Sequence, residues 1–134
     1  MTENDIVLAV DEMRKAQKRY FAVRIAANLD AMRDKEEAVR ALLAKKQVFS
    51  VKVTEILDVA RAMLEYQQGW INARNLATRF AVDMEKTGNG PDAQLRLQNL
   101  QTQERKLEAT CRKLEKKLDE LIARYHRPVL PGLE

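Results

Sequence analysis

Residues 93–125 read AQLRLQNLQTQERKLEATCRKLEKKLDELIARY, and this stretch decides the fold. Apolar side chains recur in it at alternating intervals of four and three residues, which is the a/d spacing of a coiled-coil seam. The stretch contains neither Gly nor Pro, so no residue type in it breaks a helix. We predict one long helix with a seam, interrupted at Glu104, of Ala93, Leu97, Leu100, Leu107, Cys111, Leu114, Leu118, Leu121 and Tyr125.

A second seam of the same spacing precedes the first, and the two are separated by a turn signal. Gly88 suits a left-handed helix end, and Pro91 suits the first turn of the next helix. In an antiparallel pair the numbers of facing residues have a constant total, and seven pairs across this turn share the total 177. We therefore predict an antiparallel coiled-coil hairpin from about residue 51 to residue 125. Its first seam consists of Ile56, Val59, Met63, Tyr66, Trp70, Ala73, Ala77, Phe80 and Met84.

The first 47 residues carry two apolar stripes on different sides of a helix. One runs from Ile6 to Ala27, and the other contains Ala22, Ile25, Leu29, Met32, Val39 and Leu43. Positions two residues apart point about 200° apart on a helix. The chain therefore either turns near residues 28–30 or continues as one helix that offers different faces to different partners. No Gly or Pro marks a turn there, so we favour the continuous helix to about Gln47.

The predicted fold is all-α, with the long hairpin packed with an N-terminal helix or helical pair as a three- or four-helix bundle. The joint lies at residues 48–51, with Ser50 or Thr54 as the N-cap of the following helix. We predict a single domain over residues 1–127. Residues 128–134 contain two prolines and form a C-terminal tail that cannot be helical.

A shift of 50 residues aligns the N-terminal segment with the first helix of the hairpin. Any two amphipathic helices can align in this way, so an internal duplication of residues 1–47 and 51–125 is a hypothesis. The aligned pairs include Ile6 with Ile56, Met13 with Met63, Gln17 with Gln67, Tyr20 with Trp70 and Arg24 with Arg74.

Length and composition fit one helical domain in a reducing compartment. The chain has 134 residues and only four Gly and three Pro, which leaves long stretches free of helix breakers. The net charge of +4 is spread along the chain, so nucleic acid is a permitted partner and not a required one. No apolar run approaches the ~18 residues of a membrane span. The start lacks the basic residues of a signal peptide, and the single cysteine suits a reducing interior. We expect a cytoplasmic protein that does not bind membranes.

The sequence offers no cluster of residues for catalysis or metal binding. His126 is the only histidine and stands at a helix end, whereas a zinc site or a general base needs neighbours. Cys111 occupies a seam position, so a core thiol is its expected role. We predict no catalytic residue, cofactor, metal or small-molecule substrate, and hence no enzyme. The acidic side chains alternate with Lys and Arg and are typical of a solvated helical face: Glu36, Glu37, Glu115, Asp119 and Glu120.

Two groups of residues are candidates for partner binding. Tyr20 and Phe21 are adjacent, so a single seam cannot bury both; one of them meets a third helix, a second subunit or a foreign partner. With the neighbouring stripe they predict a protein-binding surface of Tyr20, Phe21, Arg24, Ile25, Leu29 and Met32. The alternative is a nucleic-acid-binding accessory or regulatory protein that uses the basic outer face of the last helix. That face contains Arg105, Lys106, Arg112, Lys113, Lys116 and Lys117.

Residues 13–24 read MRKAQKRYFAVR, which has the pattern Met-Arg-x-Ala-Gln-Lys-x-Tyr-Phe-x-x-Arg. This motif resembles one in short, uncharacterised helical proteins of prophages and mobile elements of Bacteroidetes. A Leu and an Asp that follow in those proteins are replaced here by Lys35 and Arg40. The family has no known activity, so the resemblance implies a setting only: a phage or mobile-element accessory, cytoplasmic or assembled into a phage particle. We expect a non-enzymatic interaction or scaffold protein that forms homo-oligomers.

Overall fold

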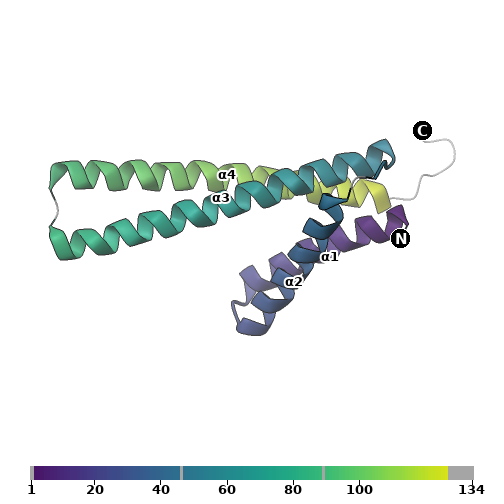
Figure 1. Ribbon diagram of the computed structural model, residues 1–134, viewed down its shortest axis with the longest axis horizontal. Helices are drawn as coiled ribbons and strands as arrows, with labels where there is room; N and C mark the ends of the chain where they lie inside the picture. Colours follow the sequence, from purple (N-terminus) through teal and green to yellow (C-terminus); the bar gives the residue numbers. More distant parts are fainter. Residues whose placement is uncertain (1, 46, 89, 127–134) are drawn as a thin grey trace. The chain divides into compact units, whose positions relative to one another are not determined.

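The computed structural model describes residues 2–45, 47–88 and 90–126, and within them the chain is helical without strands. The helices are α1 (Glu3–Ala22), α2 (Ala26–Ala44), α3 (Val51–Thr87) and α4 (Pro91–His126). Figure 1 shows α3 and α4 as a long antiparallel hairpin, and α1 and α2 as a second, shorter one. The predicted all-α class and the hairpin from about residue 51 to 125 are confirmed. The predicted tail, residues 128–134, lies outside the described residues.

The two predicted seams are the least exposed sides of α3 and α4. Every seam residue is buried or half-buried except Tyr66, which is 42% exposed. At the turn, Gly88 has a φ of +102°, and its N–H donates to the carbonyl of Met84 over 2.9 Å. Pro91 is the first residue of α4. The turn chemistry therefore follows the sequence prediction, because only glycine adopts this φ without a steric penalty.

Gly69 lies inside α3 and Gly88 directly follows that helix. Replacement of each glycine by alanine should change the free energy of unfolding, in opposite directions at the two positions. Gly88→Ala is expected to lower it by about 1 kcal/mol, because a Cβ strains the left-handed backbone. Gly69→Ala is the matched control, since it lies inside α3 with open space around the added Cβ. It should raise the free energy of unfolding by about 0.5–1 kcal/mol. Urea melts of both variants test this, and equal effects at the two positions would contradict it.

The favoured continuous N-terminal helix is wrong, because the chain turns between Ala22 and Ala26. Val23 and Ile25 are extended, with φ of −136° and −111°. The Asn28 side-chain amide donates to the carbonyl of Val23 over 2.8 Å, which satisfies a backbone acceptor at the break. β-Branched residues have weaker helix propensity, so Val23 and Ile25 mark a turn without Gly or Pro. The break lies before the alternative position, residues 28–30.

Side-chain caps fix the starts of α1 and α3. Thr2 and Asp5 form a reciprocal capping box at the start of α1. The Ser50 hydroxyl accepts from the Val53 N–H over 3.4 Å, which confirms Ser50 as the N-cap of α3. Glu3 accepts from the Ser50 N–H over 2.8 Å. This last contact joins the first turn of α1 to the joint before α3.

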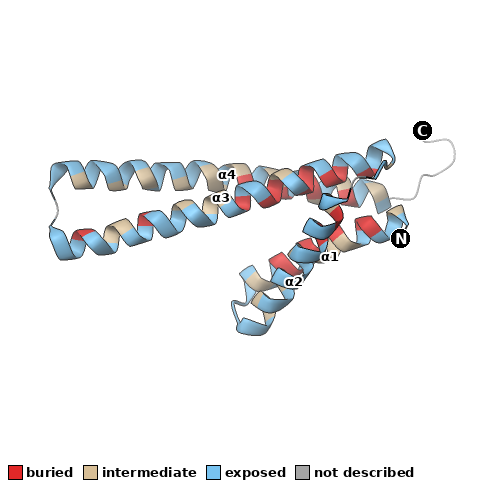
Figure 2. Cartoon of the chain, viewed as in Figure 1, coloured by how far each residue is buried: buried red, intermediate tan, exposed pale blue. Residues whose placement is uncertain are grey.

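The chain divides into two compact units, and α3 and α4 run through both. Unit 1 contains residues 1–61 and 116–134, so it combines α1, α2, the start of α3 and the end of α4. Its described part holds most of the buried apolar side chains (Figure 2). The largest fully buried ones are Ile6, Val7, Val10, Met13, Val39, Val53, Ile56 and Leu118. Unit 1 is thus a small four-helix core.

Unit 2, residues 62–115, is formed by the rest of α3 and α4 alone. Among its described residues only Met63, Leu64, Ala77, Met84 and Cys111 are buried apolar side chains. Trp70, Phe80, Leu100 and Leu107 in its seams are half-buried. Two helices bury a single face each, so unit 2 has a thinner core than unit 1. The prediction of a single domain over residues 1–127 stays a prediction.

The 50-residue shift also aligns buried positions. Ile6, Val7, Val10, Met13, Arg14 and Gln17 are buried, and so are their counterparts Ile56, Leu57, Ala60, Met63, Leu64 and Gln67. Beyond these, the two segments differ, because α1 ends at Ala22 whereas α3 continues to Thr87. A shared helical period produces part of this agreement. The internal duplication therefore stays a hypothesis.

Candidate interaction site

The turn between α1 and α2 gathers four of the six predicted partner-binding residues. The rings of Tyr20 and Phe21 meet edge to face with centroids 5.5 Å apart, and the Arg24 guanidinium lies 5.8 Å from the Phe21 centroid. Tyr20 is half-buried, whereas Phe21 is 37% exposed. Aromatic and cation–π contacts of this kind restrain the side chains involved. Phe21 is therefore held in place at the surface by its neighbours.

Two aliphatic side chains at the same turn are more exposed than Phe21. Val23 is 54% exposed and Ile25 is 53% exposed. Both sit in the extended backbone of the break between α1 and α2. We call Tyr20, Phe21, Val23, Arg24 and Ile25 the hairpin tip, after the short hairpin of α1 and α2 that they close. Sequence reasoning placed four of these residues in a binding surface and missed Val23.

The remaining two predicted partner residues lie elsewhere. Leu29 and Met32 are half-buried on α2, on the side that carries its buried residues Val39 and Leu42. This side of α2 is the second stripe of the sequence, which was predicted to face a partner. Most of it instead packs within the chain, because the turn at Val23–Ile25 folds α2 back along α1. Only its first residues, Ala22 and Ile25, are exposed.

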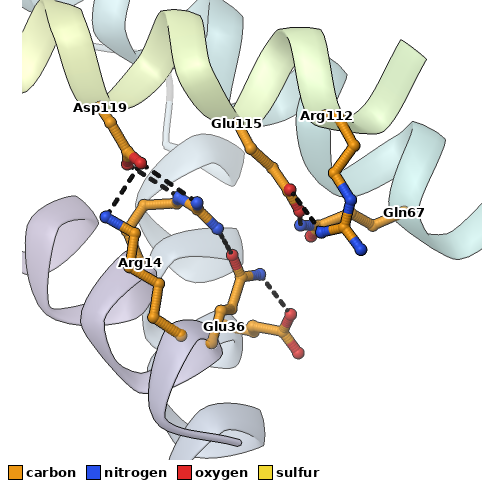
Figure 3. Close-up of polar contacts among 8 residues, drawn as sticks. Arg14, Glu36, Gln67, Arg112, Glu115 and Asp119 are labelled. Atoms are coloured by element: carbon orange, nitrogen blue, oxygen red, sulfur yellow. Dashed lines mark hydrogen bonds and ion pairs between the residues drawn. The ribbon is translucent and has the colours of Figure 1, made fainter. Parts of the chain in front are cut away.

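Sequence reasoning missed a cluster of buried polar side chains in unit 1. Arg14 is 6% exposed and its guanidinium contacts both carboxylate oxygens of Asp119, at 2.9 and 3.2 Å. Arg14 also donates to the side-chain amide oxygen of Gln17 over 2.7 Å, and the Gln17 side-chain amide N–H donates to Glu36 over 2.7 Å (Figure 3). Lys18 adds a second cation 3.0 Å from Asp119. The cluster joins α1, α2 and α4.

The charges of this cluster stabilise one another. Burial by itself raises the pKa of Asp119, but hydrogen bonds from Arg14 and Lys18 outweigh it and hold that pKa below its ordinary value. A buried guanidinium needs such partners, because an unpaired charge in a low-dielectric interior is costly. The cluster therefore links α1, α2 and α4 through paired charges and hydrogen bonds.

Unit 2 has a smaller cluster of the same kind. The Gln67 amide donates to Glu115 over 2.9 Å, and Arg112 donates to the other Glu115 oxygen over 3.1 Å. The Arg112 guanidinium also lies 5.8 Å from the centroid of the Trp70 ring (Figure 3 shows the polar part). Glu115 is 7% exposed, so its assignment to a solvated face is wrong. Of that face, Glu36 and Asp119 are half-buried, and Glu37 and Glu120 are exposed.

The six basic residues proposed for nucleic-acid contact are all exposed on α4. Arg112 is engaged with Glu108, Glu115 and Trp70. The other five form no ion pair with any residue in the described ranges. Exposed lysines are the ordinary state of an outer helix face. This placement adds nothing to the nucleic-acid alternative, which stays a prediction.

Cys111 is buried on α4, whereas His126 is exposed at the end of that helix. Cys111 is 2% exposed, and burial, with the nearby Glu115 carboxylate, raises its pKa to about 11. The thiol is therefore protonated at neutral pH and lacks the thiolate that a nucleophile needs. His126 ends α4 with its ring edge-on to Tyr125, at a centroid distance of 5.5 Å. Within residues 2–45, 47–88 and 90–126, no group of three or more His, Cys, Asp and Glu residues could hold a metal ion.

The fold and these surfaces define a class: an all-α hairpin protein with an exposed apolar turn between its first two helices. The chain matches no family model, no curated protein and no solved structure. The likeness of residues 13–24 to prophage proteins therefore stays a prediction. Across the described helices, none is long and apolar enough to cross a membrane.

Proposed function

We propose that this chain is a non-enzymatic helical interaction protein that self-associates through the hairpin tip. The observation that supports this is the joint exposure of Phe21, Val23 and Ile25 at one turn. The setting in a phage or mobile element is proposed with it, on the sequence motif alone.

The hairpin tip differs from scattered surface hydrophobes in two ways. Single exposed apolar residues are common on soluble proteins and need no explanation. Here three lie within five residues, at a turn that projects them from the ends of two helices. Phe21 is already ordered by Tyr20 and Arg24, so little side-chain entropy is lost when a partner covers it. An ordered apolar turn of this kind favours contact with a matching apolar surface.

Loss of the hairpin tip is expected to weaken self-association. The test compares the wild type with the double variant Phe21→Ser, Ile25→Ser, by light scattering on a sizing column across a range of concentrations. The wild type should exceed the 15.4 kDa of one chain. The variant should need about tenfold higher concentration to reach the same mass, because burial of these side chains is lost.

The control is Leu95→Ser, which removes an apolar side chain that is 57% exposed on α4. It should leave the association unchanged. Circular dichroism of each variant checks that the helices persist. A wild type of 15.4 kDa at every concentration would overturn self-association. An oligomer that is indifferent to the tip variant would overturn the tip as the contact.

A further inference from the structure

A row of exposed residues at heptad spacing on α3 changes its charge along the helix. Positions 58, 65, 72, 79 and 86 hold Asp, Glu, Asn, Arg and Lys, and all are exposed. Glu65, Arg79 and Lys86 make no ion pair with any residue that the structure describes. The row therefore runs from acidic through neutral to basic, and much of its charge has no partner among the residues that the structure describes.

Beside this row lies a second stripe of α3 with coiled-coil spacing. Gln68, Ile71, Asn75, Thr78 and Val82 follow one another at alternating intervals of three and four residues, and all are exposed. Ile71 and Val82 are 44% and 45% exposed. Ile71 and Thr78 follow the seam residues Trp70 and Ala77 by one position, which is about 100° around the helix. The stripe is thus a separate face from the seam toward α4.

The stripe mixes apolar and polar side chains, so charge has to define how a partner lies on it. Ile71 and Val82 supply apolar area, whereas Gln68, Asn75 and Thr78 carry hydrogen-bonding groups. Polar residues at seam positions lower the stability of a coiled coil but restrict its register. A contact along this stripe is therefore expected to be reversible, with its direction set by the charged row.

The charged row and the stripe are compatible with the same antiparallel register between two copies of α3. Glu65 and Arg79 are each seven residues from Asn72, so an antiparallel pair centred there places Glu65 opposite Arg79 of the second copy. In the same antiparallel pair, the stripe residues face each other as Ile71 with Asn75 and Gln68 with Thr78. The stripe is therefore centred at position 73, whereas the charged row is centred at position 72. The centres differ by one residue, as expected for a charged row that flanks a seam.

The alternative arrangements are less favourable. A parallel pair in register sets the charged row of one copy beside the other flank of the second copy, so Arg79 faces Arg74 and Glu65 has no basic residue opposite it; like charges at facing positions destabilise a coiled coil. The antiparallel pair has one unfavourable contact, on the opposite flank of the stripe, between Arg74 and its own copy. Arg74 is exposed, so water screens most of that repulsion. Unit 2 carries eight basic and seven acidic residues, a net charge of +1, so overall repulsion between copies is small.

We propose that a second copy of this chain binds along α3, antiparallel, with Ile71, Asn75 and Thr78 at its centre and Glu65 paired with Arg79 of the second copy. This rests on the self-association proposed above and adds a second contact to the hairpin tip. Two separate self-contacts on one chain would link copies beyond the dimer.

The test uses charge reversal in the background of the tip variant Phe21→Ser, Ile25→Ser, so that the α3 contact is measured alone. Glu65→Arg and Arg79→Glu are each expected to raise the dissociation constant of the dimer about tenfold at low ionic strength, since two attractive pairs become repulsive. The double variant, with Glu65→Arg and Arg79→Glu on one chain, should restore the dissociation constant of the background. An equimolar mixture of the two single variants should also restore it, as a heterodimer.

Only an antiparallel contact between these two positions makes each single variant weaken the dimer while both the double variant and the mixture restore it. Lys113→Glu on α4 is the matched control and should leave the dimer unchanged. Ile71→Lys, in the middle of the stripe, should abolish the dimer while the helical signal is retained. Single variants that associate as strongly as the background would overturn the proposal. An equimolar mixture that associates no more strongly than each single variant would also overturn it.

The background variant separates this inference from the proposed function. A wild type that associates while the background is a monomer supports the tip and overturns the α3 contact. A background that is as dimeric as the wild type supports the α3 contact and overturns the tip. A wild type that stays a monomer overturns both.

Discussion

Leu118→Ala is expected to lower the free energy of unfolding by about 3 kcal/mol. Leu118 is a seam residue of α4 with no exposed surface, in the core of unit 1. Truncation removes its buried methyl groups and leaves a cavity that rigid helices fill only in part. Thermal or urea unfolding followed by circular dichroism measures the loss. In a domain of this size the corresponding fall in the melting temperature is about 10 °C.

Leu95→Ala is the matched control, because it makes the same chemical change on the same helix. Leu95 is 57% exposed, so its truncation creates no cavity. Alanine also has the higher helix propensity, so the free energy of unfolding should change by less than about 0.5 kcal/mol. Equal losses at residues 118 and 95 would mean that the seam of α4 is not the core.

The long hairpin was predictable because its signals are local and repeated. Leu118 and the other seam residues fill nine of the ten seam positions of α4, and Gly88 and Pro91 mark the turn between the two patterns. The break after α1 has no such signal. Val23, Ile25 and Asn28 act together there, and each is tolerated within a helix on its own. A turn made by weak preferences is decided by packing, since α2 buries Val39 and Leu42 only when it folds back.

The candidate site was predicted only in part, because some of its residues give a local signal whereas others depend on how the helices pack. Adjacent Tyr20 and Phe21 indicated that one seam cannot cover both, and Phe21 is indeed exposed. Leu29 and Met32 were predicted to bind a partner because they belong to an apolar stripe on a continuous helix. They are half-buried instead, because the chain breaks before α2 and the stripe packs within the chain. The polar clusters are contacts between distant segments, such as Arg14 with Asp119 and Gln67 with Glu115. No local pattern distinguishes these side chains from the charged residues of a solvated face.

Asp119→Asn is expected to lower the free energy of unfolding by about 2 kcal/mol at neutral pH. The change leaves the buried Arg14 guanidinium without the carboxylate that accepts two of its hydrogen bonds. Breaking one side of a buried charge pair costs more than the pair itself contributes, because the remaining charge stays desolvated. Asp119 is only partly buried, so the effect is smaller than for a fully enclosed pair.

The pH dependence of this difference has a definite sign. The pKa of Asp119 is lower in the folded chain than its ordinary value, so the folded state binds its proton less readily than the unfolded state. The carboxylate therefore stabilises the fold above the unfolded pKa of about 4, and this contribution is lost as the pH falls through the folded pKa. The wild type and Asp119→Asn should accordingly converge in stability in acid, as urea melts across a pH series would show.

Glu120→Gln is the control at the neighbouring position, since Glu120 is exposed and forms no ion pair with the described residues. It should change stability little at any pH. Arg14→Met combined with Asp119→Asn should lose less than the two single variants together, because the buried guanidinium is removed with its partner. Additive losses would mean that Arg14 and Asp119 contribute independently. In that case the cluster could not be the contact that holds α1 against α4.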